Sequence, residues 1–293
     1  MTLDLVAFRR SGIVDNVYTK IVAVFFLFLN AVCTFSDDRF KNIKVLLEEE
    51  QYEEAISQLE RLPKEDTAPN PRVLNAVGWA YLKLNNYVKA EKYLKASFEQ
   101  AKILGNKEAA VISSNNLGIL SYLKNDLDQA EDYFDIGKER KSETALIYLD
   151  LIENKKKQIE FQDALLTGIK SRRDQDFKAA IASYNNALVI QPNDVATLEF
   201  KGYALLRNDQ YELAIEALER AKSLDPTRKL VHLNLVKAYC LMQSDHGVKQ
   251  SIKESLLGEK QFVDWYTVDL EFRRMCHHSK YLSELVNRHE LNG

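Results

Sequence analysis

The chain has 293 residues, of which 46% are hydrophobic and 28% are charged, as in ordinary folded proteins. Ten glycines and five prolines are too few for the many turns of an all-β protein, so the composition favours an all-α fold with short connections. A formal net charge of −3 provides no basic excess for holding phosphate groups, so we do not expect nucleic acid as a partner.

The first 36 residues are expected to serve in targeting rather than in the fold. Lys20 precedes the apolar run IVAVFFLFL, and small residues follow it, which is the layout of a signal peptide. The apolar stretch 21–35 would span roughly 22 Å as a helix, less than the roughly 30 Å of a bilayer core. We therefore predict a cleaved signal peptide at 1–36. The alternatives are an uncleaved anchor with membrane attachment through 20–36, lipidation at Cys33, and a buried helix in a cytosolic protein.

Two stretches later in the chain carry the same pattern at a fixed offset. QDFKAAIASYNNALVIQPND, at 175–194, is matched by DQYELAIEALERAKSLDPTR, at 209–228. Aromatic, small and proline positions are kept: Phe177, Ala180 and Pro192 in the first stretch, and Tyr211, Ala214 and Pro226 in the second. The charges change between the copies, as expected of a solvated face, so the kept positions are predicted to contact neighbouring repeats.

A glycine precedes each of these alanines by twelve residues, and the same pairing occurs twice more upstream. The pairs are Gly78 with Ala90, Gly118 with Ala130, Gly168 with Ala180, and Gly202 with Ala214. We interpret each pair as the close crossing of two antiparallel helices, where a larger side chain would force the helices apart. Two weaker copies have Ile43 and Val236 in the place of glycine.

This pattern resembles the tetratricopeptide repeat, a helix-turn-helix unit of about 34 residues whose copies stack and share a continuous core. The resemblance covers about residues 37–242 and implies a right-handed superhelix of about six units with a helical C-terminal cap. The expected organisation is three units at 37–141, the second of them extended, then a joining helix at 142–160, three units at 161–242, the last of them partial, and the cap at 243–293. The joining helix either stands alone or runs unbroken into the helix that contains Gly168.

In this family the first helix of each unit lines a concave groove that holds a protein or peptide, so the resemblance implies such a groove here. The residues expected to line it are Asn75, Trp79, Leu82, Lys83, Asn115, Ile119, Tyr122, Ile169, Arg172, Arg173, Glu199, Tyr203, Arg207, Leu233 and Lys237. Apolar positions would anchor a peptide, and arginines would orient its polar or acidic groups. The alternative for Trp79 and Tyr203 is packing against neighbouring helices.

Some members of the family hold a C-terminal carboxylate with two lysines, two asparagines and one arginine. Asn75 and Asn116 are present in this sequence, but the lysines of that set are not. A partner held only by its C-terminal carboxylate is therefore not expected.

The sequence contains no glycine-rich phosphate loop, no HExxH and no GxSxG, so we expect no enzyme activity and no cofactor. Cys276, His277 and His278 are adjacent, but neighbours on a helix point about 100° apart and cannot converge on one metal ion, so no metal is expected. Cys240 and Cys276 could form a disulfide between the sixth repeat and the cap in an oxidising compartment. The alternative is two small buried residues.

The function predicted from these features is a non-enzymatic protein-interaction scaffold. We expect it to be exported to the periplasm or anchored facing outward, with assembly of envelope or secretion machinery as the implied process. One alternative is an immunity protein that neutralises an exported toxin, and another is a cytosolic adaptor. The sequence indicates neither the partner's identity nor the oligomeric state.

Overall fold

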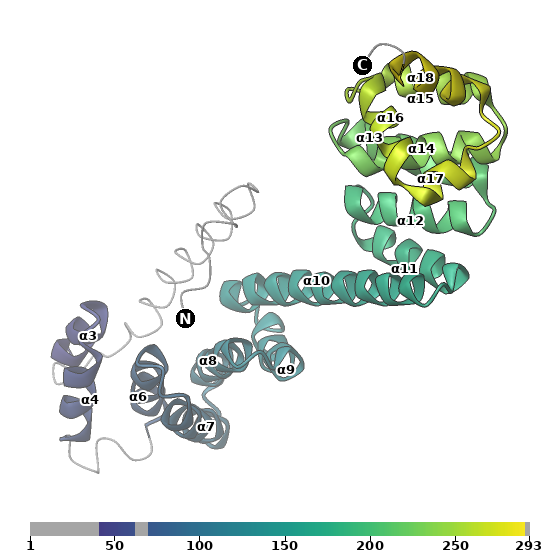
Figure 1. The fold of residues 1–293 in the computed structure, drawn as a ribbon. Coiled ribbons are helices and arrows are strands. Elements are labelled where there is room, and N and C mark those ends of the chain that lie inside the picture. Colours follow the sequence, from purple (N-terminus) through teal and green to yellow (C-terminus); the bar gives the residue numbers. More distant parts are fainter. Residues whose placement is uncertain (1–40, 62–69, 291–293) are drawn as a thin grey trace. The chain divides into compact units, whose positions relative to one another are not determined.

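A computed structural model describes residues 41–61 and 70–290, and within these ranges the regular elements are helices, with no β-strand. The all-α fold expected from the sequence is confirmed. The segment 1–36, expected to be a signal peptide, lies outside the described residues. The chain divides into two compact parts, Met1–Lys156 (unit 1) and Lys157–Gly293 (unit 2), which are described separately (Figure 1).

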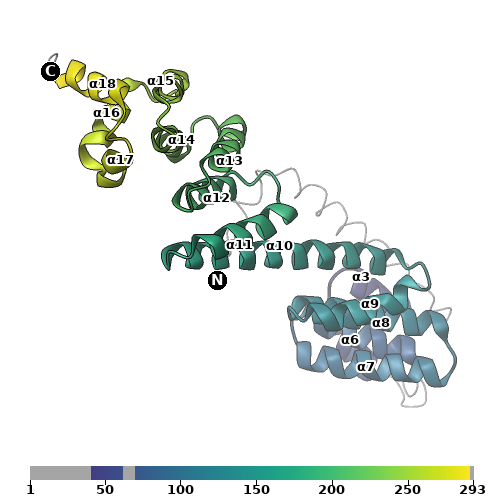
Figure 2. The ribbon, with the colours of Figure 1, turned by 90° about the vertical axis from the view of Figure 1, so that its right-hand side faces the viewer.

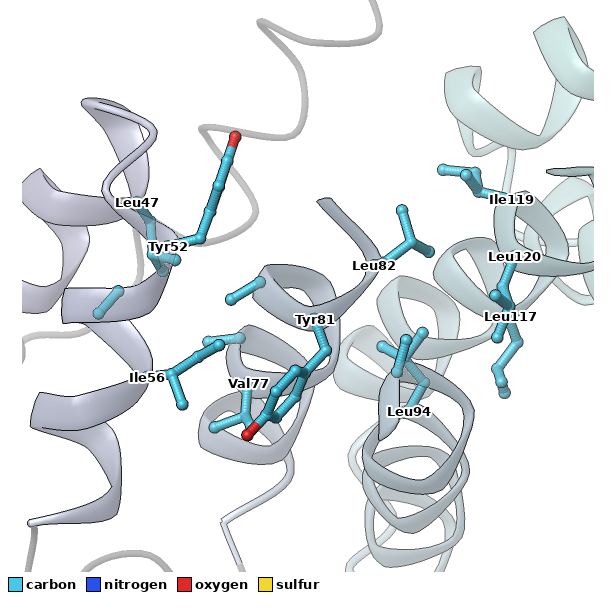
Figure 3. Close-up of a cluster of buried hydrophobic side chains, with 14 of the residues drawn as sticks. Leu47, Tyr52, Ile56, Val77, Tyr81, Leu82, Leu94, Leu117, Ile119 and Leu120 are labelled. Atoms are coloured by element: carbon cyan, nitrogen blue, oxygen red, sulfur yellow. The ribbon is translucent and has the colours of Figure 1, made fainter. Parts of the chain in front are cut away.

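Unit 1 is a series of helices in which each packs against the next (Figure 2). Its helices before the long one are α3 (Lys41–Glu48), α4 (Tyr52–Glu60), α6 (Pro71–Lys83), α7 (Tyr87–Ile103), α8 (Lys107–Leu123) and α9 (Leu127–Lys138). α7 and α8 have 17 residues each, against 13 in α6. One apolar cluster runs through this unit, and Figure 3 shows members of it from α4, α6, α7 and α8, among them Tyr52, Leu94 and Leu120.

The next element, α10 (Glu143–Arg173), is a single helix of 31 residues. It includes most of the segment 142–160 that was expected to join two groups of repeats, and it continues through Gly168. Of the two alternatives for this segment, the structure therefore has the unbroken helix. The division between the two units falls within α10, after Lys156.

Unit 2 begins in the second half of α10 and is also built of consecutive helices. They are α11 (Phe177–Ile190), α12 (Val195–Arg207), α13 (Tyr211–Leu224), α14 (Lys229–Leu241), α15 (Asp245–Glu254), α16 (Glu259–Val268), α17 (Leu270–Met275) and α18 (Lys280–Glu290). α15 packs on α14, and Gly247 lies against the ring of Tyr239. Gly247, on the second of these two helices, permits their close crossing. The boundary expected at residue 242 falls at the turn of this hairpin.

In the described ranges, seven turns between consecutive helices each contain one non-glycine residue in the left-handed region. These residues are Glu50, Asn85, Asn125, Lys141, Gln175, Asp209 and Gln243, with φ between 55° and 63°. The last four are equally spaced along the chain, and their spacing equals the length of the repeat. The next residue often caps the following helix: the side chain of Asp176 accepts a hydrogen bond of 3.0 Å from the backbone N–H of Ala179.

The repeat glycines make room for large side chains on the second helix of each hairpin. A Cβ added to the glycine would lie 2.5 to 2.8 Å from the nearest atom in each of the pairs Gly78 with Leu94, Gly118 with Phe134, Gly168 with Tyr184, and Gly202 with Leu218. The alanines of the sequence pattern, Ala90, Ala130, Ala180 and Ala214, are fully buried. The residue four positions after each alanine fills the space above the glycine. Pro192 and Pro226 lie in the turns after α11 and α13.

Candidate functional site

Four residues expected to line the groove in unit 1 are buried instead. Asn75, Leu82, Asn115 and Ile119 are 4 to 6% exposed. The two asparagines among them form side-chain hydrogen bonds within the chain. The amide of Asn116 donates to Asn75 Oδ1 at 2.8 Å. The amide of Asn115 donates to Ser142 Oγ at 2.7 Å. These side chains hold α6, α8 and the start of α10 together, so a partner cannot contact them directly.

The partly exposed members in unit 1 combine aromatic rings with lysines. On α6, the Nζ of Lys83 lies 5.7 Å from the ring centroid of Trp79, and these two residues form the Trp79 patch. The Trp79 ring also packs partly against the apolar core. On α8, the Nζ of Lys155 from α10 lies 4.8 Å from the ring centroid of Tyr122. The Tyr122 ring meets the Tyr148 ring edge-on at 5.5 Å, and Tyr122, Tyr148 and Lys155 form the Tyr122 patch.

Burial raises the pKa values of both tyrosines in the Tyr122 patch. Burial, and to a smaller extent the neighbouring Tyr122, raises the pKa of Tyr148 to about 12. Burial also raises the pKa of Tyr122. Both hydroxyl groups are therefore neutral at physiological pH, and the charge of this patch comes from Lys155.

In unit 2, the predicted residues of α10 and α12 form a stacked cluster. The guanidinium carbon of Arg172 lies 5.2 Å from the ring centroid of Phe200 and 5.8 Å from that of Tyr203. Arg173 beside it is exposed, and Ile169 is partly buried. Within the described part of the chain neither arginine pairs with a carboxylate.

The end of the expected groove is filled by α17. The Tyr203 hydroxyl, an Nη of Arg207 and the Lys237 ammonium each donate to the carboxylate of Glu271 at 2.9 Å. Lys237, only 3% exposed, also donates to Asp269 at 3.0 Å. Of the expected groove residues here, Lys237 is therefore not available to a partner, and Tyr203 and Arg207 are already bonded within the chain.

The charges of this cluster are mutually stabilised. Burial raises the pKa of Glu271, but the hydrogen bond and charge of Lys237, with smaller contributions from Tyr203 and Arg207, outweigh burial and hold that pKa below its usual value. The pKa of Asp269 is likewise lowered: its burial is outweighed by backbone N–H groups and Lys237. Both carboxylates are ionised at neutral pH.

The two remaining groove residues of unit 2 are buried as well. Glu199, 3% exposed, accepts a hydrogen bond from Arg228. Leu233, 5% exposed, belongs to the apolar core of the cap. Contrary to the expectation from the sequence, neither side chain can meet a partner.

Apolar packing and a disulfide hold α17 in this place. Phe272 is fully buried with Leu233 and Val236 of α14. Cys276, which follows α17, is bonded to Cys240 of α14, with 4.9 Å between their Cα atoms. Of the two alternatives that the sequence left for these cysteines, the structure has the disulfide. The docking of α17 was missed from the sequence, since a contact across 64 residues leaves no local pattern.

A metal centre would need several ligand side chains close together among the described residues. Within them, no three or more histidine, cysteine, aspartate or glutamate residues are grouped so that they could hold a metal ion. Cys276 is in the disulfide, and the adjacent rings of His277 and His278 lie 3.5 Å apart between centroids. Over the same ranges, every helix is too short or too polar to cross a membrane.

Residues 40–102 and 171–229 match the family model of the tetratricopeptide repeat. Each unit therefore contains a stretch that matches the tetratricopeptide repeat, as the sequence pattern predicted. No curated protein matches the sequence.

Several solved structures are similar to the chain. One is titled a TPR2AB-domain:pHSP90-complex of yeast Sti1, with 16% identity and a TM-score of 0.47 over 83% of this chain and 97% of that chain. Another is PilW, titled a widely conserved type IV pilus biogenesis factor, with 14% identity and a TM-score of 0.32 over 82% of this chain and 98% of that chain. Yeast Tom70 shows 18% identity and a TM-score of 0.33 over 81% of this chain and 44% of its own.

Proposed function

We propose that the chain is a non-enzymatic protein-interaction scaffold whose binding surface lies on the first helices of its hairpins. The tetratricopeptide repeats in both units support this proposal, because stacked hairpins present a row of adjacent helices to a partner. The observation that carries it is in unit 1. There, aromatic rings of α6 and α8 remain partly exposed, with lysine ammonium groups 5.7 and 4.8 Å from their centroids.

Such patches suit a protein partner for a physical reason. Aromatic side chains bury a large area at low entropic cost, and they dominate the binding energy of many interfaces. A partner that covers the Trp79 and Tyr122 patches would exclude water from their cation–π pairs and strengthen them. In unit 2 the equivalent face is partly covered by α17, so we propose unit 1 as the main binding surface.

The test compares cellular partners of two variants. Tyr122→Ala removes the ring at the centre of the Tyr122 patch, whereas Tyr211→Ala makes the same change on α13, a second helix of a hairpin. Full-length tagged protein is cross-linked in its native cells, purified and analysed by mass spectrometry. We expect the recovered amount of at least one cross-linked protein to fall about tenfold or more with Tyr122→Ala and to be unchanged with Tyr211→Ala. The circular dichroism spectra of the two variants should be equal. Equal recovery of every cross-linked protein with the unaltered chain and both variants would contradict the proposal.

Export is part of the proposal. The layout of the segment 1–36 supports it, and so does the disulfide between Cys240 and Cys276, because disulfides persist mainly in oxidising compartments. The process that we propose is assembly of envelope or secretion machinery. Alkaline phosphatase fused after Asp38 tests export: an active enzyme is expected, and an inactive one would favour a cytosolic adaptor.

A further inference from the structure

Two arginines on the first helices of unit 2 stack against the same tyrosine. The guanidinium carbons of Arg172 and Arg207 lie 5.8 and 5.9 Å from the ring centroid of Tyr203. Each also stacks on a second ring, Arg172 on Phe200 at 5.2 Å and Arg207 on Phe177 at 4.9 Å. The two guanidinium sites are therefore built alike.

The two sites differ in what they hold. Arg207 donates to the carboxylate of Glu271 at 2.9 Å, and Tyr203 donates to the same carboxylate. Arg172 is paired with no carboxylate among the residues that the structure describes, and neither is the exposed Arg173 beside it. One site is thus filled by the chain's own glutamate, while its neighbour lacks a counter-charge.

We propose that Arg172 binds a carboxylate on an acidic segment of a partner protein. That segment lies beside α17, on the face of unit 2 that carries Arg172 and Arg207. This inference rests on the proposed function and names the class of partner. Stacking on two rings fixes the plane of the guanidinium, so little entropy is lost when a carboxylate binds its terminal N–H groups. The Nε–H of Arg172 is buried, so those terminal groups are the ones that receive the carboxylate. Glu271 on Arg207 is the internal precedent for this contact.

The surroundings define the partner further. In α17, Glu271 is followed directly by the buried Phe272, so the internal occupant combines a carboxylate with an apolar anchor. Ile169, partly buried on the same helix as Arg172, offers an apolar contact to a partner of the same kind. The exposed Asp174 and Asp176 follow α10 directly and disfavour a polyanion such as nucleic acid. The partner segment therefore carries a glutamate or aspartate beside an apolar residue.

The test measures fluorescence anisotropy of a labelled peptide with the full chain at low ionic strength. The probe is a twelve-residue peptide that carries one glutamate beside a phenylalanine among uncharged residues, and its matched control has glutamine in place of that glutamate. Arg172→Gln removes the proposed anchor. Lys178→Gln removes an exposed cation from α11 and changes the net charge equally.

We expect Arg172→Gln to weaken binding of the acidic peptide about tenfold, which corresponds to about 1.4 kcal/mol. Lys178→Gln should change it by less than about twofold, and the glutamine peptide should bind far more weakly to the unaltered chain. Equal affinities of the two variants would overturn the inference, as would equal binding of the two peptides or no binding of the acidic peptide.

Two further comparisons keep the outcome interpretable. If Arg172→Gln loses its helical circular dichroism, Arg172→Lys takes its place; it keeps the charge but loses the planar fork, and unchanged affinity would then overturn the inference. If Tyr122→Ala loses its cellular partner while Arg172→Gln binds the peptide as Lys178→Gln does, the scaffold proposal stands and this inference is wrong. If peptide binding requires Arg172 but Tyr122→Ala keeps every partner, the inference stands and unit 1 is not the main binding surface.

Discussion

An Nη of Arg207 on α12 lies 2.9 Å from a carboxylate oxygen of Glu271 on α17, across 64 residues of sequence. Glu271 also accepts from the buried Lys237, which ties α14 to the same carboxylate. Two cationic side chains, one on α12 and one on α14, thus contact the same acidic side chain of the cap. The cap is therefore held in place by charge as well as by its apolar core.

Glu271→Gln should destabilise unit 2 at neutral pH by about 1–2 kcal/mol. The change leaves Arg207 without its carboxylate and the buried Lys237 with only Asp269. A buried pair that loses one partner costs about 3–5 kcal/mol, and we reduce this because the side chain of Glu271 is 32% exposed. Urea unfolding followed by the fluorescence of Trp265 in the cap measures the effect. Glu284→Gln, at an exposed position of α18, is the control and should have no effect.

Acid should reduce the difference in stability between the unaltered chain and Glu271→Gln. The folded chain holds the pKa of Glu271 below its ordinary value of 4.5, so between the two pKa values the unfolded chain binds more protons. The stability that Glu271 contributes is thus complete above the ordinary value and is lost as the pH falls through the folded pKa. Urea unfolding is compared at pH 7 and at about pH 3. An equal difference at both pH values would show that the charge of Glu271 does not matter.

Gly202→Ala should lower stability by up to about 2 kcal/mol although alanine is the better helix former. Alanine gains about 1 kcal/mol in helix propensity, but its Cβ would lie 2.5 Å from Cγ of Leu218, and overpacking costs about 1–3 kcal/mol. Leu218→Ala alone should cost about 3 kcal/mol through the cavity that it leaves. The double variant should lose at least about 1 kcal/mol less than the sum, because it removes the clash. Additive losses in urea unfolding would mean that the two residues do not compete for space.

The repeated elements could be predicted because their physical cause is local and periodic. A glycine at a close crossing of two helices recurs at a fixed sequence distance from a small residue. Gly168 and Gly202 therefore locate the hairpins without a structure. The side chain above each glycine, such as Tyr184 or Leu218, was not singled out because many large residues occupy similar positions. The spacing therefore determines the crossing, whereas packing decides which side chain fills it.

The candidate site was less predictable, because exposure depends on distant segments. The position of Lys237 in its repeat places it on a first helix, which the family resemblance assigned to the groove. The structure buries it under Asp269 and Glu271, which belong to the non-repetitive cap. Sequence spacing gives the face of a helix on which a residue lies. It does not show whether a later segment such as α17 covers that face.

Gln175→Gly should stabilise unit 2 by about 0.5–1 kcal/mol. Gln175 has φ of 62°, a conformation that costs a non-glycine residue about 1 kcal/mol or more, and glycine adopts it without strain. The greater freedom of glycine in the unfolded chain offsets part of this gain. Gln191→Gly, at a position with φ of −124°, is the control and should destabilise slightly. Thermal unfolding followed by circular dichroism measures both; a lower stability of Gln175→Gly would contradict the strain argument.

Replacing both Cys240 and Cys276 with alanine should lower the stability of unit 2 by about 3 kcal/mol. The disulfide closes a loop across 36 residues, and a loop of that size restricts the unfolded chain by about 3–4 kcal/mol. Urea unfolding followed by Trp265 should shift to lower urea, whereas the signal of Trp79 in unit 1 should not. Alkylation of the denatured, unreduced protein with iodoacetamide, followed by peptide mapping, checks the premise. Neither cysteine should be labelled before reduction, and labelling of both would contradict the disulfide.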